Sequence, residues 1–310
     1  MKRNRIGRTG LEVSAIGLGT VELGLDYGAP GASGTAPPQE AEAARLLNYA
    51  LDRGVDFIDT ARLYGTSEEI IGRAIGHRRR EFTLATKVFH FAPQGLRGAA
   101  LRERVFDSIH TSLRMLRTDC VDILKVHSAP RDVVVDDEFR DILEEARARG
   151  LARFLGASVY GEAGMAALRT GRYGCLQIAY NALDRSAESE LIPLAAETGA
   201  GLIVRSVLLK GVLTSRYQSL PQALADLSAA AAAMDSLARE AGITLPELAY
   251  RYVLGNPGCA VALAGTARME ELEATLGYAE AGPLPPDLSA RVSEIRVANP
   301  ALVNPSTWPA

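Results

Sequence analysis

The stretch Asp59-Thr60-Ala61-Arg62-Leu63-Tyr64-Gly65-Thr66-Ser67-Glu68 joins a short buried strand to the start of a helix. The apolar run at 55–58 predicts the strand, which the acid at the head of the stretch ends. Thr66 and Glu69 have the spacing of a capping box, and an apolar pair follows, so we expect a helix to begin there. The acid therefore lies at the carboxyl end of a strand, and Tyr64 lies in the loop beyond it. In parallel α/β folds, active sites are built at that rim.

The same order of strand and helix continues along the chain. The expected strands are 15–18, 55–59, 83–87, 121–127, 154–158, 176–179, 201–205 and 259–264. The expected helices are 39–53, 67–75, 99–116, 137–149, 161–170, 188–198, 222–240, 245–254 and one that begins at Met269. The strands are short apolar runs, as expected when both faces of a sheet are buried. Eight such β/α units predict a closed (β/α)8 TIM barrel rather than an open sheet.

We expect one barrel domain over residues 1–310, because no shift in composition divides the chain. Gly7, Thr9 and Gly10 separate short apolar pieces, which predicts an N-terminal hairpin at 3–13. The Pro-rich stretch 299–310 is expected to be a C-terminal tail that folds over one end of the barrel. The stretch 24–38, rich in Gly and Pro, is long for an α/β connection, and it is either a substrate lid or a connector without fixed structure.

Composition excludes several classes of protein. The chain has 310 residues, is 47% hydrophobic and carries a net charge of −3, so neither a nucleic acid nor an anionic membrane surface is an expected partner. No apolar run reaches the length that spans a bilayer, and residues 1–5 are not followed by the apolar core of a signal peptide. Cys120, Cys175 and Cys259 are widely separated, so we expect no disulfide, no metal site and a cytoplasmic location.

Four ionisable side chains lie at or just beyond the ends of successive strands: Asp59, Tyr64, Lys87 and His127. A barrel brings these strand ends together around one mouth. Tyrosine is a weak acid, with an unperturbed pKa of about 10, and a nearby ammonium group is expected to lower that pKa. A carboxylate can hold the ammonium in place, and a histidine can orient a carbonyl oxygen or relay the proton. This set of groups suits protonation of an oxygen while a hydride reaches its carbon.

With these four residues in place, the chain resembles the aldo-keto reductases from about residue 5 to 280. The resemblance rests on the Asp59–Glu68 stretch and on further segments, which are Gly17-Leu18-Gly19-Thr20, Thr86-Lys87, Val126-His127, Gly156-Ala157-Ser158, Gln177 with Tyr180-Asn181, and Gly265-Thr266. It implies a (β/α)8 barrel and, in most members, NADPH as cofactor. It also implies that Tyr64 is the general acid/base, that Lys87 and Asp59 tune its pKa, and that His127 positions the carbonyl.

The resemblance further implies a set of cofactor-binding residues. Ser158 and Gln177 would bind the nicotinamide carboxamide, and a loop from Arg205 would wrap the pyrophosphate. The full set is Gly19, Thr20, Val21, Asp59, Ser158, Gln177, Arg205, Ser206, Leu208, Gly211, Gly265, Thr266 and Arg268.

Several positions depart from the family pattern, among them Val159, where an Asn often follows the serine at 158. Arg205 stands where a tyrosine commonly stacks on the nicotinamide, and its guanidinium can stack, hold a phosphate or bind an acidic substrate. Glu271 replaces a basic or amide residue, and Ala274-Thr275 replaces a Glu-Asn pair, which weakens the expected hold on adenine and a 2′-phosphate. Arg268 remains as a phosphate partner, so the sequence favours NADP(H) and leaves NAD(H) open.

Lys125 has the same strand parity as His127, so both side chains are expected to point into the barrel. A buried ammonium needs a partner or a lowered pKa, and the sequence identifies no partner for it. His77, His90 and His110 show no ligand spacing and are expected at the surface or on helices. Taken singly, Asp59 could merely cap a helix and Lys87 could be a solvated strand end.

The sequence therefore predicts an oxidoreductase that interconverts an aldehyde or ketone and an alcohol. Three alternatives stay open: a sugar or polyol dehydrogenase that works oxidatively, a regulatory subunit that binds the cofactor and senses redox state, and a cofactor-free barrel lyase or isomerase. The substrate is expected to be a small carbonyl compound or sugar, chosen by the long loops 24–38, 89–97, 129–135 and 217–227 and by the tail 298–310. The oligomeric state is open.

Overall fold

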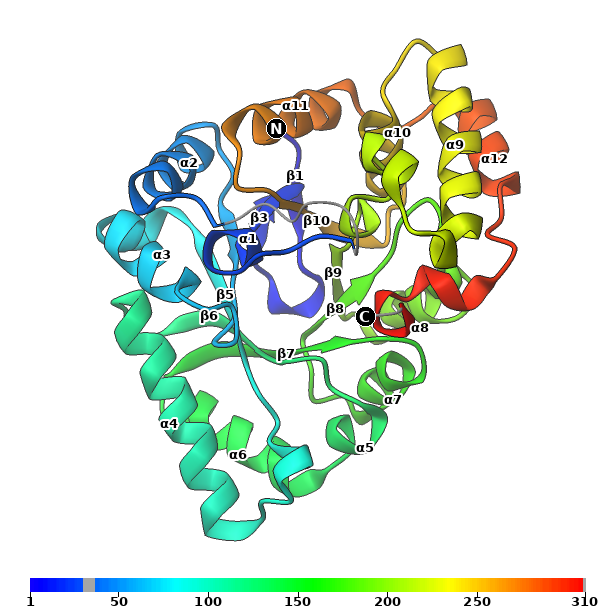
Figure 1. The fold of residues 1–310 in the computed structure, drawn as a ribbon. Helices are drawn as coiled ribbons and strands as arrows, with labels where there is room; N and C mark the ends of the chain where they lie inside the picture. The colour runs from blue at the N-terminus through cyan, green and yellow to red at the C-terminus, as the bar shows by residue number, and fades with distance from the viewer. Residues whose placement is uncertain (30–36, 309–310) are drawn as a thin grey trace.

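The computed structural model of the chain describes residues 1–29 and 37–308. Within these residues, eight parallel strands close into a barrel in the order β10-β3-β4-β5-β6-β7-β8-β9 (Figure 1). The strands are β3 (Ile16–Gly19), β4 (Phe57–Asp59), β5 (Thr83–Val88), β6 (Val121–Val126), β7 (Ala152–Val159), β8 (Cys175–Ala179), β9 (Gly201–Arg205) and β10 (Cys259–Gly265). The predicted (β/α)8 barrel is confirmed, and each predicted strand agrees to within about two residues at either end.

The helices form a ring outside the barrel (Figure 1). The helices that pack around the strands are α2 (Glu40–Asp52), α3 (Ser67–Ile75), α4 (Gly98–Leu116), α6 (Asp137–Ala148), α7 (Glu162–Thr170), α8 (Leu191–Thr198), α10 (Leu245–Leu254) and α11 (Met269–Ala281), and α9 (Ala225–Glu240) lies outside α10. Amphipathic sequences explain this arrangement: the face of α4 that carries Leu101, Val105 and Ile109 is buried. Three helices were not predicted from the sequence: the short α1 (Val21–Gly24) and α5 (Arg131–Val134), and α12 (Pro286–Glu294) near the C-terminus.

Inside the barrel, one layer of side chains is apolar and the next layer along the strands is polar or charged. Near the amino ends of the strands, the buried residues include Phe57, Ala85, Ile123, Cys175 and Ile203. Alternate residues of a strand face the same side, so the residues two positions further along the same strands also point inward. Those residues are Asp59, Lys87, Lys125, Gln177 and Arg205. The polar end of the interior is therefore the carboxyl end of the strands, where barrel enzymes carry their active sites.

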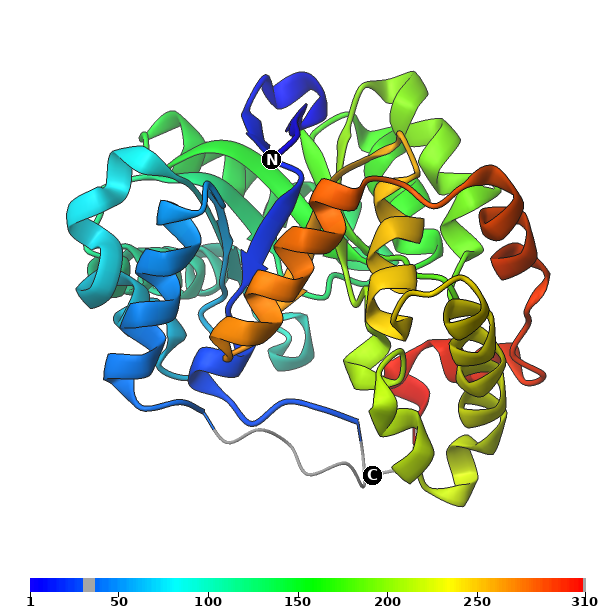
Figure 2. The same cartoon turned by 90° about the horizontal axis from the view of Figure 1, so that it is seen from above.

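The N-terminal hairpin closes the opposite, apolar end of the barrel (Figure 2). Strands β1 (Arg3–Arg5) and β2 (Glu12–Ser14) pair antiparallel, which confirms the predicted hairpin. Ile6 between them is fully buried, and the Asn4 side chain donates to Ala260 O at 2.9 Å. The hairpin therefore acts as a plug that leaves the rim at the carboxyl ends as the open end.

The C-terminal segment lies toward the other end of the molecule from the hairpin (Figure 2). Its 3-10 turns, η8 (Pro300–Val303) and η9 (Pro305–Thr307), lead to Trp308, whose indole donates to Leu302 O at 2.7 Å. Trp308 is buried. Of the segments expected to choose the substrate, residues 30–36 of the 24–38 loop and residues 309–310 of the tail lie outside the described residues.

Helix α3 begins at Ser67 as predicted, but the predicted capping box is wrong. Thr66 has φ −88° and ψ 2°, not the extended conformation of a capping residue, and its side chain accepts no capping bond. Glu69 pairs instead with Arg73 at 2.5 Å. Among the described helices, none has both the length and the apolarity needed to cross a membrane.

Candidate active site

The centre of the rim is an ammonium group whose three protons each have an acceptor. Lys87 Nζ lies 2.6 Å from Asp59 Oδ2, 2.9 Å from Thr60 O and 3.1 Å from Tyr64 OH. Lys87 and Asp59 are buried, whereas Tyr64 is half-buried at the edge of a cleft. The barrel thus places Tyr64 beside the Lys87–Asp59 pair, where Tyr64 and Asp59 line the cleft.

The other oxygen of the Asp59 carboxylate carries a second ammonium. Lys125 Nζ donates to Asp59 Oδ1, and the Lys125 side chain is fully buried. This contact confirms the inward direction expected for Lys125 and supplies the partner that the sequence did not identify. The floor of the site therefore holds one carboxylate between two ammonium groups.

The ordinary pKa values of these groups do not hold inside the barrel. Burial pushes the pKa of Asp59 up, but the charges of Lys125 and Lys87 outweigh it and hold that pKa at about 2. Burial lowers the pKa of both lysines, while Asp59 acts in the opposite direction. Asp59 is therefore a carboxylate throughout the physiological range.

The expectation that a neighbouring ammonium lowers the pKa of Tyr64 is wrong for this structure. Burial raises that pKa, and the Asp59 carboxylate raises it further, while Lys125 and Arg205 lower it by less. Tyr64 is therefore a phenol at neutral pH, which is the form that can donate a proton.

His127 follows the end of β6 and stands beside the tyrosine. Its ring meets that of Tyr64 edge-on, with centroids 5.6 Å apart and planes at 86°. Burial, and then the charge of Lys87, lower the pKa of His127 to about 3, so the imidazole is neutral. Among the described residues, its Nδ1 atom is buried without a hydrogen-bond partner. A neutral imidazole offers one donor and one acceptor, which suits it to orient a carbonyl oxygen.

The loop that carries Tyr64 is fixed by hydroxyl groups and by a close backbone approach. Thr20 Oγ1 donates to Asp59 O at 2.9 Å, and Ser67 Oγ donates to Thr20 O at 2.9 Å. A Cβ added at Gly24 would lie 2.0 Å from Tyr64 O, so only glycine lets α1 approach the loop. The hydroxyl groups of Thr20 and Ser67 and the close approach of Gly24 thus fix the loop that carries the tyrosine.

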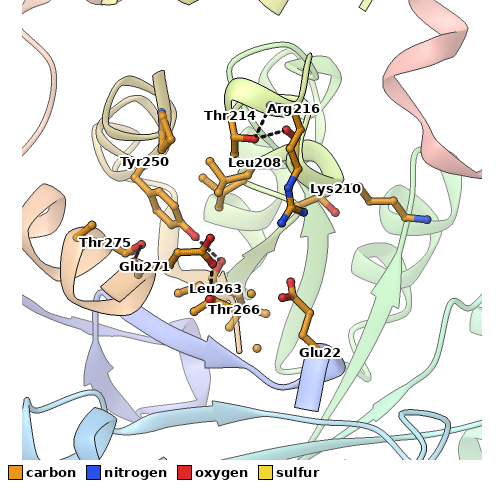
Figure 3. Close-up of a pocket in the computed structure, with 18 of the residues that line it drawn as sticks. Glu22, Leu208, Lys210, Thr214, Arg216, Tyr250, Leu263, Thr266, Glu271 and Thr275 are labelled. Carbon is orange, nitrogen blue, oxygen red and sulfur yellow. Dashed lines mark hydrogen bonds between the residues drawn. The ribbon is translucent and has the colours of Figure 1, made fainter. Parts of the chain in front are cut away.

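A cleft of about 610 Å³ runs outward from the tyrosine between the segments that follow β3, β9 and β10 (Figure 3). The predicted cofactor residues that line it are Gly19, Thr20, Val21, Asp59, Gln177, Arg205, Ser206, Leu208, Gly211, Gly265, Thr266 and Arg268. Ser158 is buried opposite Gln177 in the β7–β8 pair and does not line the described cleft. Among the described residues, Gln177 Nε2 is buried without a hydrogen-bond partner.

The inner and outer parts of the cleft differ in charge. Arg205 lines the inner part, and within the described residues it forms no ion pair, its guanidinium donating to Ser206 Oγ at 3.2 Å. At the outer end, Arg268 is ion-paired with Glu271, which also accepts from Thr266 Oγ1 at 2.5 Å. Figure 3 shows Glu271 directed into the cleft beside Tyr250.

Comparison with known proteins agrees with this geometry. The model of the Aldo/keto reductase family matches residues 15–297. The chain belongs to the aldo/keto reductase family. It is 30% identical to the aldo-keto reductase YhdN of Bacillus subtilis, over 88% of this chain and 87% of YhdN. It is 28% identical to a probable voltage-gated potassium channel subunit beta of Arabidopsis thaliana, over 92% of this chain and 93% of that protein.

The fold of this aldo-keto reductase also matches solved structures. One is the holo form of aldo-keto reductase AKR11C1 from Bacillus halodurans, with a TM-score of 0.78 and 28% identity. The match covers 95% of this chain and 96% of that chain. Members of this family are oxidoreductases that act on small carbonyl compounds.

Several residues of this reductase's cleft were missed by sequence reasoning. Arg216 lines the cleft, packs over Gly211 and points its guanidinium toward the centre (Figure 3). Lys210 lies over the rings of Tyr27 and Trp308, at 5.2 Å and 5.9 Å from their centroids. The predicted pyrophosphate loop runs from Arg205 to near Gly211, and Arg216 follows shortly after its expected end. The aromatic contacts join three distant segments, so no local pattern announces them.

One histidine expected at the surface or on a helix lies elsewhere. His90 is in the segment between β5 and η3 (Ala92–Gln94), and it is buried. Its Nδ1 accepts from the backbone N–H of Ala92 at 3.2 Å, and burial lowers its pKa. This hydrogen bond gives His90 a local structural role in the turn.

Proposed function

We propose that this chain interconverts an aldehyde or ketone and an alcohol by hydride transfer, with a nicotinamide dinucleotide as cofactor and Tyr64 as general acid/base. The observation that carries the proposal is the contact of Tyr64 OH with Lys87 Nζ at 3.1 Å, at the inner end of a cleft of about 610 Å³. Asp59, whose own pKa of about 2 keeps it ionised, holds Lys87 Nζ in place and opposes the lowering of the Lys87 pKa by burial.

Two further side chains complete the proposed roles. His127 is neutral and close to the Tyr64 ring, so it can direct a carbonyl oxygen toward the phenol without adding charge. Tyr64 would donate its proton to that oxygen in reduction and take it back in oxidation. The raised pKa of Tyr64 keeps the phenol protonated at neutral pH, which favours proton donation in reduction. The proton then comes from a residue that the barrel holds 3.1 Å from a fixed cation.

The residues of the cleft fit a nicotinamide dinucleotide. The buried Gln177 Nε2 lacks a partner among the described residues, and a carboxamide oxygen would satisfy it. In barrel enzymes, phosphates bind between the loops that follow the last two strands, which here are β9 and β10. Ser206, Gly211 and Arg216 lie on the first of these loops, and Gly265 ends the second strand. When bound there, the nicotinamide would supply or accept the hydride.

The test is an absorbance assay of the purified protein with reduced dinucleotides and a panel of aldehydes and ketones. Oxidised dinucleotides would be tested with alcohols, sugars and polyols in parallel. We expect turnover in the first arm. Faster turnover with sugars or polyols in the second arm would instead make the chain an oxidative dehydrogenase. If the protein neither turned over any of these substrates nor bound a dinucleotide, the proposal would be contradicted. That outcome would favour a cofactor-free lyase or isomerase.

The second candidate, a cofactor-binding regulatory subunit, has one specific observation in its favour. The Arabidopsis relative is named as a probable channel subunit, and it matches this chain over nearly its whole length. Such a subunit needs an exposed apolar face for its partner. Among the described residues, the exposed large hydrophobics are limited to Met1, Leu25, Leu63 and Val135. Dinucleotide binding without turnover of any carbonyl or alcohol would favour this candidate.

A further inference from the structure

The outer end of the cleft is built around a carboxylate. Glu271 lies in the first turn of α11, and one of its oxygens accepts from the hydroxyl of Thr266, which is buried. Its other oxygen accepts from the guanidinium of Arg268. The backbone carbonyl of Glu271 accepts from Thr275 Oγ1 at 2.8 Å. The carboxylate is thus held at the turn from both sides rather than left to rotate in solvent.

This corner lies where the far half of a dinucleotide would end. Tyr64 and Gln177 line the inner end of the cleft, and the loops after β9 and β10 line its middle. Beyond Gly265, the lining continues through Thr266, Arg268 and Glu271. A cofactor with its nicotinamide at Tyr64 and its pyrophosphate between these loops would therefore bring its second ribose to Glu271.

The two forms of the cofactor differ at that ribose. One carries a 2′-hydroxyl, which can donate a hydrogen bond to a carboxylate, and the other carries a dianionic 2′-phosphate, which an arginine accommodates. At this corner, the guanidinium of Arg268 is already neutralised by Glu271. Within the described residues, the remaining cations that line the cleft are Lys210, Arg205, Arg216 and Arg239, and none of them lies on the β10–α11 turn. Arg239 is itself paired with Asp235.

We propose that this cleft selects NAD(H) over NADP(H), and that Glu271 is the discriminating side chain. The proposal deepens the proposed function and rests on it. Arg268, which the sequence analysis expected to hold the 2′-phosphate, serves here as the counter-ion of Glu271. A 2′-phosphate would either meet the carboxylate directly or pull Arg268 away and leave Glu271 unpaired beside it, and like charges in contact disfavour both arrangements.

The test is a fluorescence titration of the purified full-length chain with NADH and with NADPH, which needs no substrate. For the unmodified chain, we expect NADH to bind about tenfold more tightly than NADPH. Glu271→Gln removes the charge but keeps the size and a hydrogen-bonding group. We expect this variant to bind NADPH about tenfold more tightly than the unmodified chain does, because Arg268 is then free to meet the phosphate.

A matched control is Glu270→Gln, which removes an equal charge from the preceding, exposed residue of α11. It should leave the preference for NADH unchanged if the effect is local. Arg268→Ala should weaken NADPH binding in the Glu271→Gln background, and a thermal melt of each variant shows that it is folded.

The outcomes separate this inference from the function on which it rests. Equal binding of the two dinucleotides, or tighter binding of NADPH, by the unmodified chain would overturn the choice of NAD(H) but leave the reductase proposal standing. A Glu271→Gln variant with an unaltered preference would overturn the role of Glu271. Failure to bind either dinucleotide would overturn the proposed function itself.

Discussion

Ion pairs occur at both the inner floor and the outer end of the cleft, but they are buried at the floor and exposed at the outer end. At the floor, Asp59 lies between Lys87 and Lys125, and all three side chains are buried. At the outer end, Glu271 pairs with Arg268, but the two side chains are 43% and 55% exposed. Burial makes the floor costly to alter, whereas water screens the outer pair. Substitutions at the floor are thus costly to stability and to the chemistry that the floor supports. At the outer end, one substitution can change which ligand binds.

The largest effect is expected where the floor meets the substrate. Tyr64→Phe keeps the ring but removes the hydroxyl that contacts Lys87. Carbonyl reduction should fall by about 10²–10⁴-fold, because proton donation is lost. Dinucleotide binding should persist. Steady-state rates and a binding titration on the same sample check both parts, and a variant that keeps its rate would remove Tyr64 from the mechanism.

The next effect tests how strongly burial constrains the floor. Asp59→Asn leaves two buried ammonium groups without their carboxylate, so we expect a loss of about 3–5 kcal/mol in the free energy of unfolding. Lys125→Met is the matched control. It leaves the Asp59–Lys87 pair intact and fills the space with an apolar chain of similar length, so its loss should be much smaller. Urea denaturation of the two variants measures the difference, and equal losses would contradict this account of the floor.

A third effect depends on pH. The pKa of His127 is about 3 in the folded chain and 6.5 ordinarily, because burial disfavours the imidazolium. Below pH 6.5 the unfolded chain therefore binds a proton that the folded chain does not, and stability falls with pH down to about 3, by up to about 1.4 kcal/mol per pH unit. In His127→Gln this contribution is absent. Urea denaturation across that range should give a shallower slope for the variant, and equal slopes would show that His127 is protonated in the fold.

The smallest effect is expected at the outer end. Arg268→Ala breaks an exposed pair, so the free energy of unfolding should change by less than about 1 kcal/mol. A loss as large as that of Asp59→Asn would erase the contrast between the two regions. Urea denaturation under the same conditions makes the two numbers comparable.

The same contrast explains how far the sequence could be interpreted. Strand parity placed Lys125 on the inner face of the barrel, and the strand ends placed Asp59 and Lys87 around its mouth. It did not show that Lys125 shares Asp59 with Lys87, because the distance between strands depends on how the barrel closes. The pKa of Tyr64 was predicted in the wrong direction, since the effect of burial on a pKa cannot be judged from residue types alone.

The outer parts of the cleft were harder to predict. Glu271 was recognised as a departure from the family pattern, but its bond to Thr266 and its pairing with Arg268 depend on how the turn folds. The contact of Lys210 with Tyr27 and Trp308 joins a loop, a 3-10 turn and the C-terminal segment. Loops follow no fixed period, so sequence spacing carries little information about which of them meet.

Because β3 pairs with β10, the barrel can close only after both strands have been synthesised. Ala262 lies beside Ile16, and the bond from Asn4 to Ala260 joins residues 256 positions apart. A ribosome adds about 5–20 residues per second, so the first strand waits on the order of ten to fifty seconds for its last neighbour. During this time, one edge of β3 is open to wrong pairing. A nascent chain without β10 also lacks one wall of the cleft, because Leu263, Ala264 and Gly265 line it.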